Sequence, residues 1–144
     1  MGNYLNTTSV CDAYSREFHS PYFVDKSLIL EQIMTRVETS TNYICITRPR
    51  RFGKTVMADM IASFFSSAND AGAVFDKLKI AGSQLYKTYA GKYDVVFISF
   101  NELPRRCRSY EQYIERIEDR LIKDLKTAYP KADIREEDAV WDAF

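Results

Sequence analysis

The sequence predicts an α/β fold in which helices cover both faces of a parallel sheet, giving three layers. Two short apolar runs carry this prediction, at residues 43–47 and 95–100. Because nearly every position in them is apolar, both faces of the two strands should be covered, as in parallel sheets. Segments with helical spacing alternate with these runs, which is the order typical of α/β folds. Since open sheets commonly have about five or six strands, two strands indicate a truncated fold.

Helices are predicted on either side of the first strand. One should span about residues 26–37, because its apolar residues recur at helical spacing and Asp25 is a residue type that caps helix N-termini. The next should begin near Thr55 and end near Ser66, with its apolar residues in pairs every four positions. Those residues are Val56, Met57, Met60, Ile61, Phe64 and Phe65.

A third, longer helix is predicted after the second strand. Ser109 and Gln112 have the spacing of a capping box at its start, and Pro130 should end it near Tyr129. The residues expected on its inner face are Tyr110, Tyr113, Ile114, Ile117, Leu121, Ile122 and Leu125. We expect residues 1–21 to be an irregular lead-in and residues 22–144 to be the N-terminal part of one domain.

Composition excludes several classes of protein. Lys and Arg together number 20, as do Asp and Glu, so a polyanion is not attracted by net charge. Hydrophobic residues make up 46% of the chain, which suits a packed core rather than disorder. The sequence contains neither a long apolar run nor a signal peptide, so we expect a cytoplasmic protein without a membrane partner.

Cysteine and histidine chemistry is not favoured. Cys11, Cys45 and Cys107 are widely spaced and are expected to be ordinary thiols. His19 is the one histidine, so every histidine-assisted nucleophile would depend on it.

The motif that carries chemistry lies at residues 47–55, Thr-Arg-Pro-Arg-Arg-Phe-Gly-Lys-Thr, between the first predicted strand and a predicted helix. Its last three residues match the end of the phosphate-binding (Walker A) pattern GxxxxGK[ST]. Gly53 lets the backbone turn without a Cβ beside a phosphate, Lys54 places an ammonium on phosphate oxygens, and Thr55 offers a hydroxyl to Mg²⁺. Amides of residues 52–55 should converge at the helix start, where the dipole favours an anion.

One position departs from the full pattern. Arg48 stands where the pattern has its first glycine, and Pro49 removes one amide early in the loop. The alternative interpretation is a glycine turn followed by a helix start with a surface lysine. The motif also does not indicate whether the bound nucleotide is ATP or GTP.

Several segments together resemble the AAA-ATPase-like domain family of bacteria and archaea over residues 20–125. They are residues 22–27 (Tyr-Phe-Val-Asp-Lys-Ser), residues 46–55, Phe64-Phe65, the segment with Phe75, Leu78 and Ile80, and residues 93–100. In that family an arginine normally replaces the first glycine of the motif. The resemblance implies a P-loop NTPase-type fold at the N-terminus of a longer protein, often followed by a domain similar to PD-(D/E)XK nucleases.

The resemblance also implies a Walker B acid for Mg²⁺ at the end of a later strand, within Asp-Glu-Tyr. The nearest counterpart is Phe100-Asn101-Glu102, where Asn stands at the expected acid position. We therefore expect the acid to lie after Phe144. ATP hydrolysis is accordingly expected only in the complete protein, and no catalytic residue is assigned.

The expected site binds ATP with Mg²⁺, and Thr55 is the metal ligand. Its nucleotide-binding residues are Arg51, Phe52, Gly53, Lys54 and Thr55. Tyr22 and Phe23 could stack on adenine, but such a pair is more often core, and Asp25 is more often a helix cap than a catalytic acid.

Two arginine clusters leave other functions open. They are Arg48, Arg50 and Arg51 in the loop, and Arg105, Arg106 and Arg108 after the second strand. Both could be solvated surface, or both could contact phosphates. One alternative function is a nucleic-acid-associated module acting with a downstream nuclease-like domain, and another is a degenerate P-loop scaffold that does not hydrolyse nucleotide.

Overall fold

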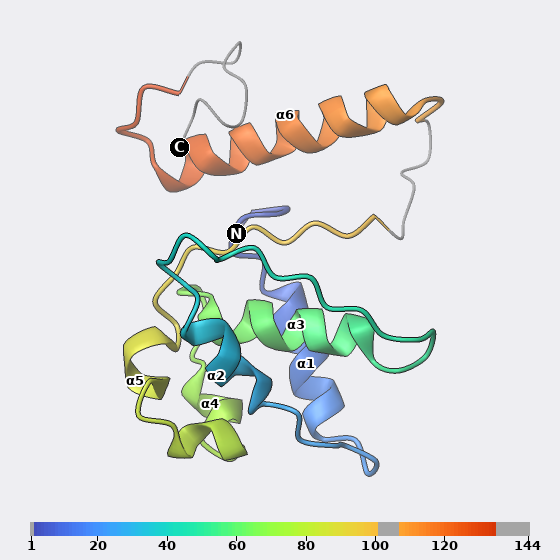
Figure 1. Ribbon diagram of the computed structural model, residues 1–144. Helices are drawn as coiled ribbons and strands as arrows, with labels where there is room; N and C mark the ends of the chain where they lie inside the picture. Colours follow the sequence, from blue (N-terminus) through green and yellow to red (C-terminus); the bar gives the residue numbers. More distant parts are fainter. Residues whose placement is uncertain (1, 101–106, 135–144) are drawn as a thin grey trace. The chain divides into compact units, whose positions relative to one another are not determined.

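The computed structural model describes residues 2–100 and 107–134, in which the regular secondary structure is helical (Figure 1). They form two units, one from Thr8 to Val95 and one that joins the chain up to Thr7 with the chain from Val96 onward. The larger unit contains α1 (Ser9–Phe18), α2 (Ile29–Met34), α3 (Lys54–Phe65), α4 (Gly72–Phe75), the 3₁₀ helix η1 (Lys79–Gly82) and α5 (Tyr86–Tyr89). The smaller unit contains α6 (Tyr110–Ala128).

The predicted three-layer P-loop NTPase-type fold with a parallel sheet is wrong for the residues described. They contain no β-strand and no sheet, and only two isolated bridges occur among them. An antiparallel bridge joins Leu5 to Val96, and a parallel bridge joins Ser66 to Tyr93.

The two apolar runs do not form strands, because neither takes part in a backbone ladder among the described residues. No backbone hydrogen bond joins residues 43–47 to another described segment, and the side chain of Tyr43 is 93% exposed. In the second run the amide of Phe97 donates to the carbonyl of Tyr4 at 2.9 Å, but this contact does not extend into a ladder. An apolar composition predicts burial, whereas a strand also needs a neighbour for its N–H and C=O groups.

The first predicted helix and the predicted irregular lead-in both need correction. Residues 26–37 are α-helical only over α2, because the side chains of Asp25 and Ser27 bind other amides instead of capping this helix. Within the lead-in, residues 9–18 form α1, which packs against α3. The residues that α1 buries are Val10 and Tyr14. The division of domains at residue 22 stays a prediction.

Aromatic rings from three helices form the core of the larger unit. Phe64 of α3 is fully buried, and its ring lies edge-on to that of Phe75 of α4 with centroids 5.2 Å apart. Tyr14 of α1 stacks on Phe75 from another direction at 5.4 Å. The predicted apolar face of α3 is confirmed, because all six of its residues are buried or packed against this core. Packing against α1 and α4 therefore holds α3, which begins at Lys54, in the core of this unit.

In the smaller unit, α6 follows its prediction closely. The Ser109 side chain accepts a hydrogen bond from the amide of Gln112 at 3.3 Å, so the predicted cap is confirmed. The helix ends at Ala128, next to the predicted end at Tyr129. Most of the predicted inner face is buried, but Tyr110 is 68% exposed because it lies in the first turn, beyond the packed part of the helix.

Asp124 of α6 holds the N-terminal segment. One carboxylate oxygen accepts hydrogen bonds from the amides of Tyr4 at 2.7 Å and Leu5 at 3.2 Å, and the other accepts one from the Asn3 side chain at 3.3 Å. The apolar side chains of Leu5, Leu121 and Leu125 are buried beside this contact. The buried charge is thus satisfied by donors from a distant part of the sequence.

This contact predicts an acid-sensitive smaller unit. Burial alone would raise the pKa of Asp124, but the amides of Tyr4, Asn3 and Leu5 together lower it. A carboxyl with a lower pKa in the folded state stabilises the fold above its unfolded pKa, and this is lost as the pH falls through the folded pKa. Asp124→Asn should cost about 1–3 kcal/mol at pH 7 and reduce the loss of stability on acidification. Urea unfolding at pH 7 and at an acidic pH measures these effects. An equal loss of stability on acidification in Asp124→Asn and in the starting protein would contradict the prediction.

Candidate functional site

The predicted loop makes a tight turn into α3. The amide of Phe52 donates to the carbonyl of Pro49 at 3.4 Å. Two residues of the loop have left-handed backbone conformations, Arg51 with φ 65° and Gly53 with φ 73°. Glycine takes this conformation without strain, whereas an arginine there costs about 1–2 kcal/mol. Strain of this kind is common at functional loops, although Asn6 and Glu38 of this chain share the conformation.

The start of α3 leaves backbone donors without partners. Its first helical hydrogen bond runs from the amide of Met57 to the carbonyl of Gly53, at 3.0 Å. No side chain caps the helix, and its first turn contains no acidic residue. The amides of Lys54, Thr55 and Val56 therefore have no acceptor among the described residues. These amides and the positive end of the helix dipole make a place where an anion is favoured.

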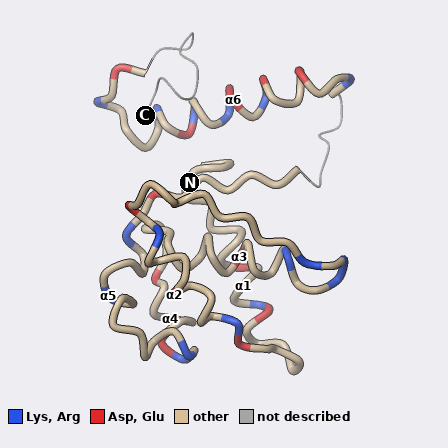
Figure 2. The backbone as a smooth tube through the Cα atoms, viewed as in Figure 1, with Lys and Arg blue, Asp and Glu red and all other residues tan. Residues whose placement is uncertain are grey.

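All five predicted nucleotide-binding residues lie on this turn, since they are consecutive in the chain. The side chains of Arg51, Lys54 and Thr55 are exposed, Phe52 is 59% exposed, and Gly53 is half-buried. Figure 2 shows the loop that leads into α3 as a concentration of basic residues. A cation at the positive end of a helix is unfavourable by itself, so Lys54 suits a turn that receives an anion.

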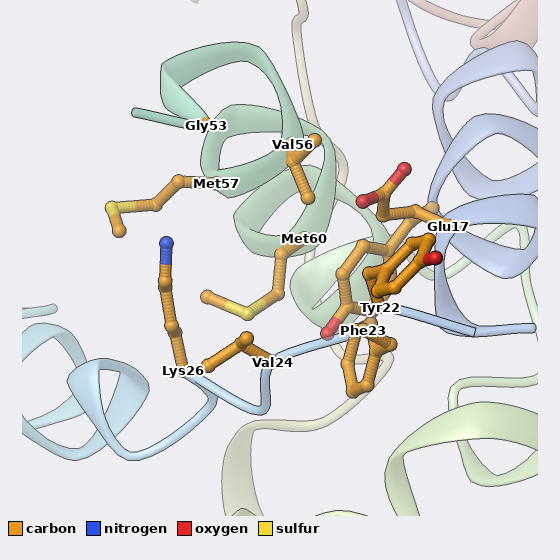
Figure 3. Close-up of a pocket in the computed structure, with 10 residues that line it drawn as sticks. Glu17, Tyr22, Phe23, Val24, Lys26, Gly53, Val56, Met57 and Met60 are labelled. Atoms are coloured by element: carbon orange, nitrogen blue, oxygen red, sulfur yellow. The ribbon is translucent and has the colours of Figure 1, made fainter. Parts of the chain in front are cut away.

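Lys26 is a second cation at the turn, which sequence reasoning missed. Its ammonium nitrogen lies 3.7 Å from the point where a Cβ at residue 53 would be. Figure 3 shows the Lys26 side chain extending toward the start of α3, next to Gly53 and Met57. The motif GxxxxGK[ST] covers only neighbouring residues, so it contains no signal for a lysine so much earlier in the chain.

Hydrogen bonds made by Asp25 and Ser27, together called the clamp, hold the backbone on either side of Lys26. The Asp25 carboxylate accepts hydrogen bonds from the amides of Ser27 and Lys79, both at 2.8 Å. The hydroxyl of Ser27, which is fully buried, accepts one from the amide of Ile80 at 3.2 Å. Fastening residues 25 and 27 to η1 fixes the backbone on both sides of Lys26, whose own side chain is exposed.

The clamp also decides the role of Asp25. Burial would raise the pKa of this carboxyl, but its hydrogen bonds with Ser27 and Lys79 lower it overall. Asp25 is therefore an ionised structural acceptor. The predicted capping role is therefore wrong, because α2 has no side-chain cap and the Asp25 carboxylate binds the amides of Ser27 and Lys79 instead.

A cavity of about 130 Å³ opens beside the turn. Its lining comes from α1, the segment 22–26 and α3, as Figure 3 shows. The lining residues are Tyr14, Glu17, Tyr22, Phe23, Val24, Lys26, Gly53, Val56, Met57 and Met60. Phe23 packs against Phe18 with centroids 5.3 Å apart, as expected of a core residue, whereas Tyr22 is 89% exposed. The sequence did not distinguish these two aromatic residues. Phe23 is part of the core, whereas the exposed Tyr22 is able to contact a ligand.

A match to a protein family covers most of the chain. A protein-family model described as predicted AAA-ATPase matches residues 16–142. The chain belongs to this AAA-ATPase-like family. The match includes the Lys26 segment, the turn before α3 and most of the cavity lining. No curated protein and no solved structure matches the AAA-ATPase-like chain.

Other predicted features of the AAA-ATPase-like chain lie partly outside the described residues. Asn101, Glu102, Arg105 and Arg106 belong to the range 101–106, which is not described. Arg108 is exposed, and its amide donates to the Gln112 side chain at 3.0 Å. Roles for the second arginine cluster, the nucleic-acid alternative and the scaffold alternative all stay predictions.

Side chains that commonly bind metals do not cluster in the described part of the chain. There, no group of three or more His, Cys, Asp or Glu side chains could hold a metal ion. Cys11, Cys45 and Cys107 are free thiols, and a ring nitrogen of His19 is hydrogen-bonded to the Ser15 carbonyl at 2.7 Å. No helix in the described ranges has the length and apolarity needed to cross a bilayer. The cytoplasmic location stays a prediction.

Proposed function

We propose that this AAA-ATPase-like chain binds ATP, with the triphosphate at the turn before α3. The observation that carries the proposal is the set of three successive amides without acceptors, at Lys54, Thr55 and Val56. Two lysine side chains accompany them, Lys54 on α3 and Lys26 beside Gly53. Backbone donors and cations in one place match the many acceptor oxygens of a triphosphate.

Each residue of the turn has a role in this proposal. The half-buried Gly53, with its φ of 73°, lets phosphate oxygens approach the backbone without a Cβ between them. Lys54 and Lys26 neutralise phosphate charge from two directions. Arg51 is exposed next to them and adds a further cation, and Phe52 contributes its amide at the entrance.

Magnesium fits this site as an ion that comes with the nucleotide. Thr55 offers one exposed hydroxyl at the start of α3, and one oxygen does not make a protein metal site. Mg²⁺ usually takes one or two protein ligands together with phosphate oxygens and waters, which agrees with Thr55 as its single ligand from this turn. When bound, the ion neutralises charge on the β and γ phosphates.

ATP hydrolysis by the complete protein is a second part of the proposal, and family membership supports it. Phosphoryl transfer depends on positioning of phosphates, metal and water. The turn supplies the first of these. The acid that would help to hold the metal remains a prediction.

Replacing Lys26 tests the site at the residue that sequence reasoning missed. Lys26→Ala should weaken binding of ATP with Mg²⁺ about tenfold, because a charge-assisted contact to phosphate is lost. The free energy of unfolding should change by less than about 0.5 kcal/mol, since the side chain is exposed. Isothermal titration calorimetry gives the affinity and urea unfolding gives the stability.

Lys87→Ala is the matched control, because Lys87 is an exposed lysine on α5 that does not line the cavity. It removes the same charge from the larger unit and should leave ATP affinity within about twofold of the starting protein. Equal affinities in the two variants would show that Lys26 does not contact the phosphates.

A further inference from the structure

The cavity beside the turn is placed to receive the part of a nucleotide that is not phosphate. Gly53, Val56 and Met57 of the phosphate end also belong to its lining. Lys26 is shared as well, and Figure 3 shows its ammonium near Met57 while Val24 faces the interior of the cavity. A ligand whose phosphates lie at the start of α3 would therefore have its remaining atoms next to this cavity.

The chemistry of the lining suits a flat, weakly polar ring system. Apolar walls come from Val24, Val56, Met57 and Met60, and an aromatic wall from Phe23. Methionine side chains adapt to irregular shapes and make favourable contacts with aromatic rings. Tyr22 stands at this cavity with 89% of its surface exposed, so its ring is available for stacking.

Two polar groups in the lining can select a base. Glu17 supplies a carboxylate that accepts hydrogen bonds. Tyr14 is 98% buried, and its hydroxyl has no hydrogen-bond partner within the described part of the chain. Burial raises the pKa of Tyr14, so the hydroxyl keeps its proton and remains a donor. A buried donor without an acceptor is costly and rare, and at a cavity it points to a ligand that supplies the acceptor.

We propose that this cavity is the adenine subsite of the nucleotide site, an inference that rests on the function proposed above. Adenine offers an amino group to Glu17 and a ring nitrogen to the Tyr14 hydroxyl. It has no carbonyl to bury against the apolar walls, whereas guanine carries O6 in addition. Tyr22 covers the exposed face of the ring.

Calorimetric titration with ATP, GTP and inorganic tripolyphosphate, each with Mg²⁺, tests the subsite. The protein should bind ATP at least about tenfold more tightly than either of the others, a ratio set by base stacking and hydrogen bonds. Tyr22→Ala and Glu17→Gln should reduce this ratio to about threefold or less while tripolyphosphate binding stays unchanged. Both positions are on the surface of the larger unit, and circular dichroism checks that each variant is folded.

Tyr14→Phe provides a test in which stability and affinity should change in opposite directions. Without ligand the variant should melt at the same or a higher temperature, because it loses an unpartnered hydroxyl. Its affinity for ATP should fall about tenfold, and its affinity for tripolyphosphate should not change. An unchanged ATP affinity in all three cavity variants, or equal binding of ATP and tripolyphosphate, would overturn the adenine subsite.

Failure of the subsite and failure of the phosphate site give different results. If only the subsite is wrong, tripolyphosphate still binds and Lys54→Ala still weakens it. If the phosphate site is wrong, Lys54→Ala leaves the binding of both compounds unchanged, whatever the cavity variants do.

Discussion

Lys54→Ala is expected to weaken binding of ATP with Mg²⁺ about 100-fold while leaving the protein slightly more stable. Loss of a charge-assisted contact to the phosphates accounts for the affinity. The rise in stability follows from the position of Lys54 in the first turn of α3, where no acidic side chain offsets it. A cation there opposes the helix dipole by about 0.3–1 kcal/mol, and solvent around this exposed side chain places the gain at the lower end.

Calorimetry with ATP and urea unfolding without ligand measure the two effects. Lys87→Ala removes the same charge from a short helix away from the turn and should change neither quantity appreciably. An ATP affinity in Lys54→Ala within about threefold of the starting protein would contradict a phosphate site at α3, and the chain would then need another explanation for its unpartnered amides.

Phe64→Ala is expected to produce the largest loss of stability in the larger unit, about 3–5 kcal/mol. Phe64 is fully buried and lies within 6 Å, between ring centroids, of Phe65, Phe75 and Tyr86. Its removal leaves a cavity where α3 meets α4 and α5, and nearby rings cannot fill it without moving the helices. Because a domain is stable by only about 5–15 kcal/mol, much of the unit should unfold at moderate urea concentrations.

Phe52→Ala serves as the comparison, since Phe52 is 59% exposed on the turn before α3. It should change the free energy of unfolding by less than about 0.5 kcal/mol. Urea unfolding followed by circular dichroism measures both variants. A loss below about 1 kcal/mol in Phe64→Ala would show that the aromatic cluster is not the centre of this core.

Local patterns predicted α3 and α6 well and the strands poorly. The apolar spacing of α3 and the capping pair Ser109 and Gln112 are properties of neighbouring residues, and both are confirmed. A helix satisfies its own backbone groups, so its sequence holds nearly all the information needed. The run at residues 43–47 has an equally clear pattern but no backbone hydrogen-bond partner among the described segments, whereas α1 was expected to be irregular and forms a helix that packs on α3.

The sequence by itself determined the turn at residues 48–55 and the start of α3, because these depend on residues that are adjacent in the chain. Several separate segments of the sequence together determined the family. Only the tertiary structure decided that Lys26 accompanies Gly53 and that a cavity with the buried hydroxyl of Tyr14 opens beside the turn. The physical reason is that Asp25 and Ser27 hold Lys26 in place through the amides of η1, far along the chain. No pattern of neighbouring residues records such a contact.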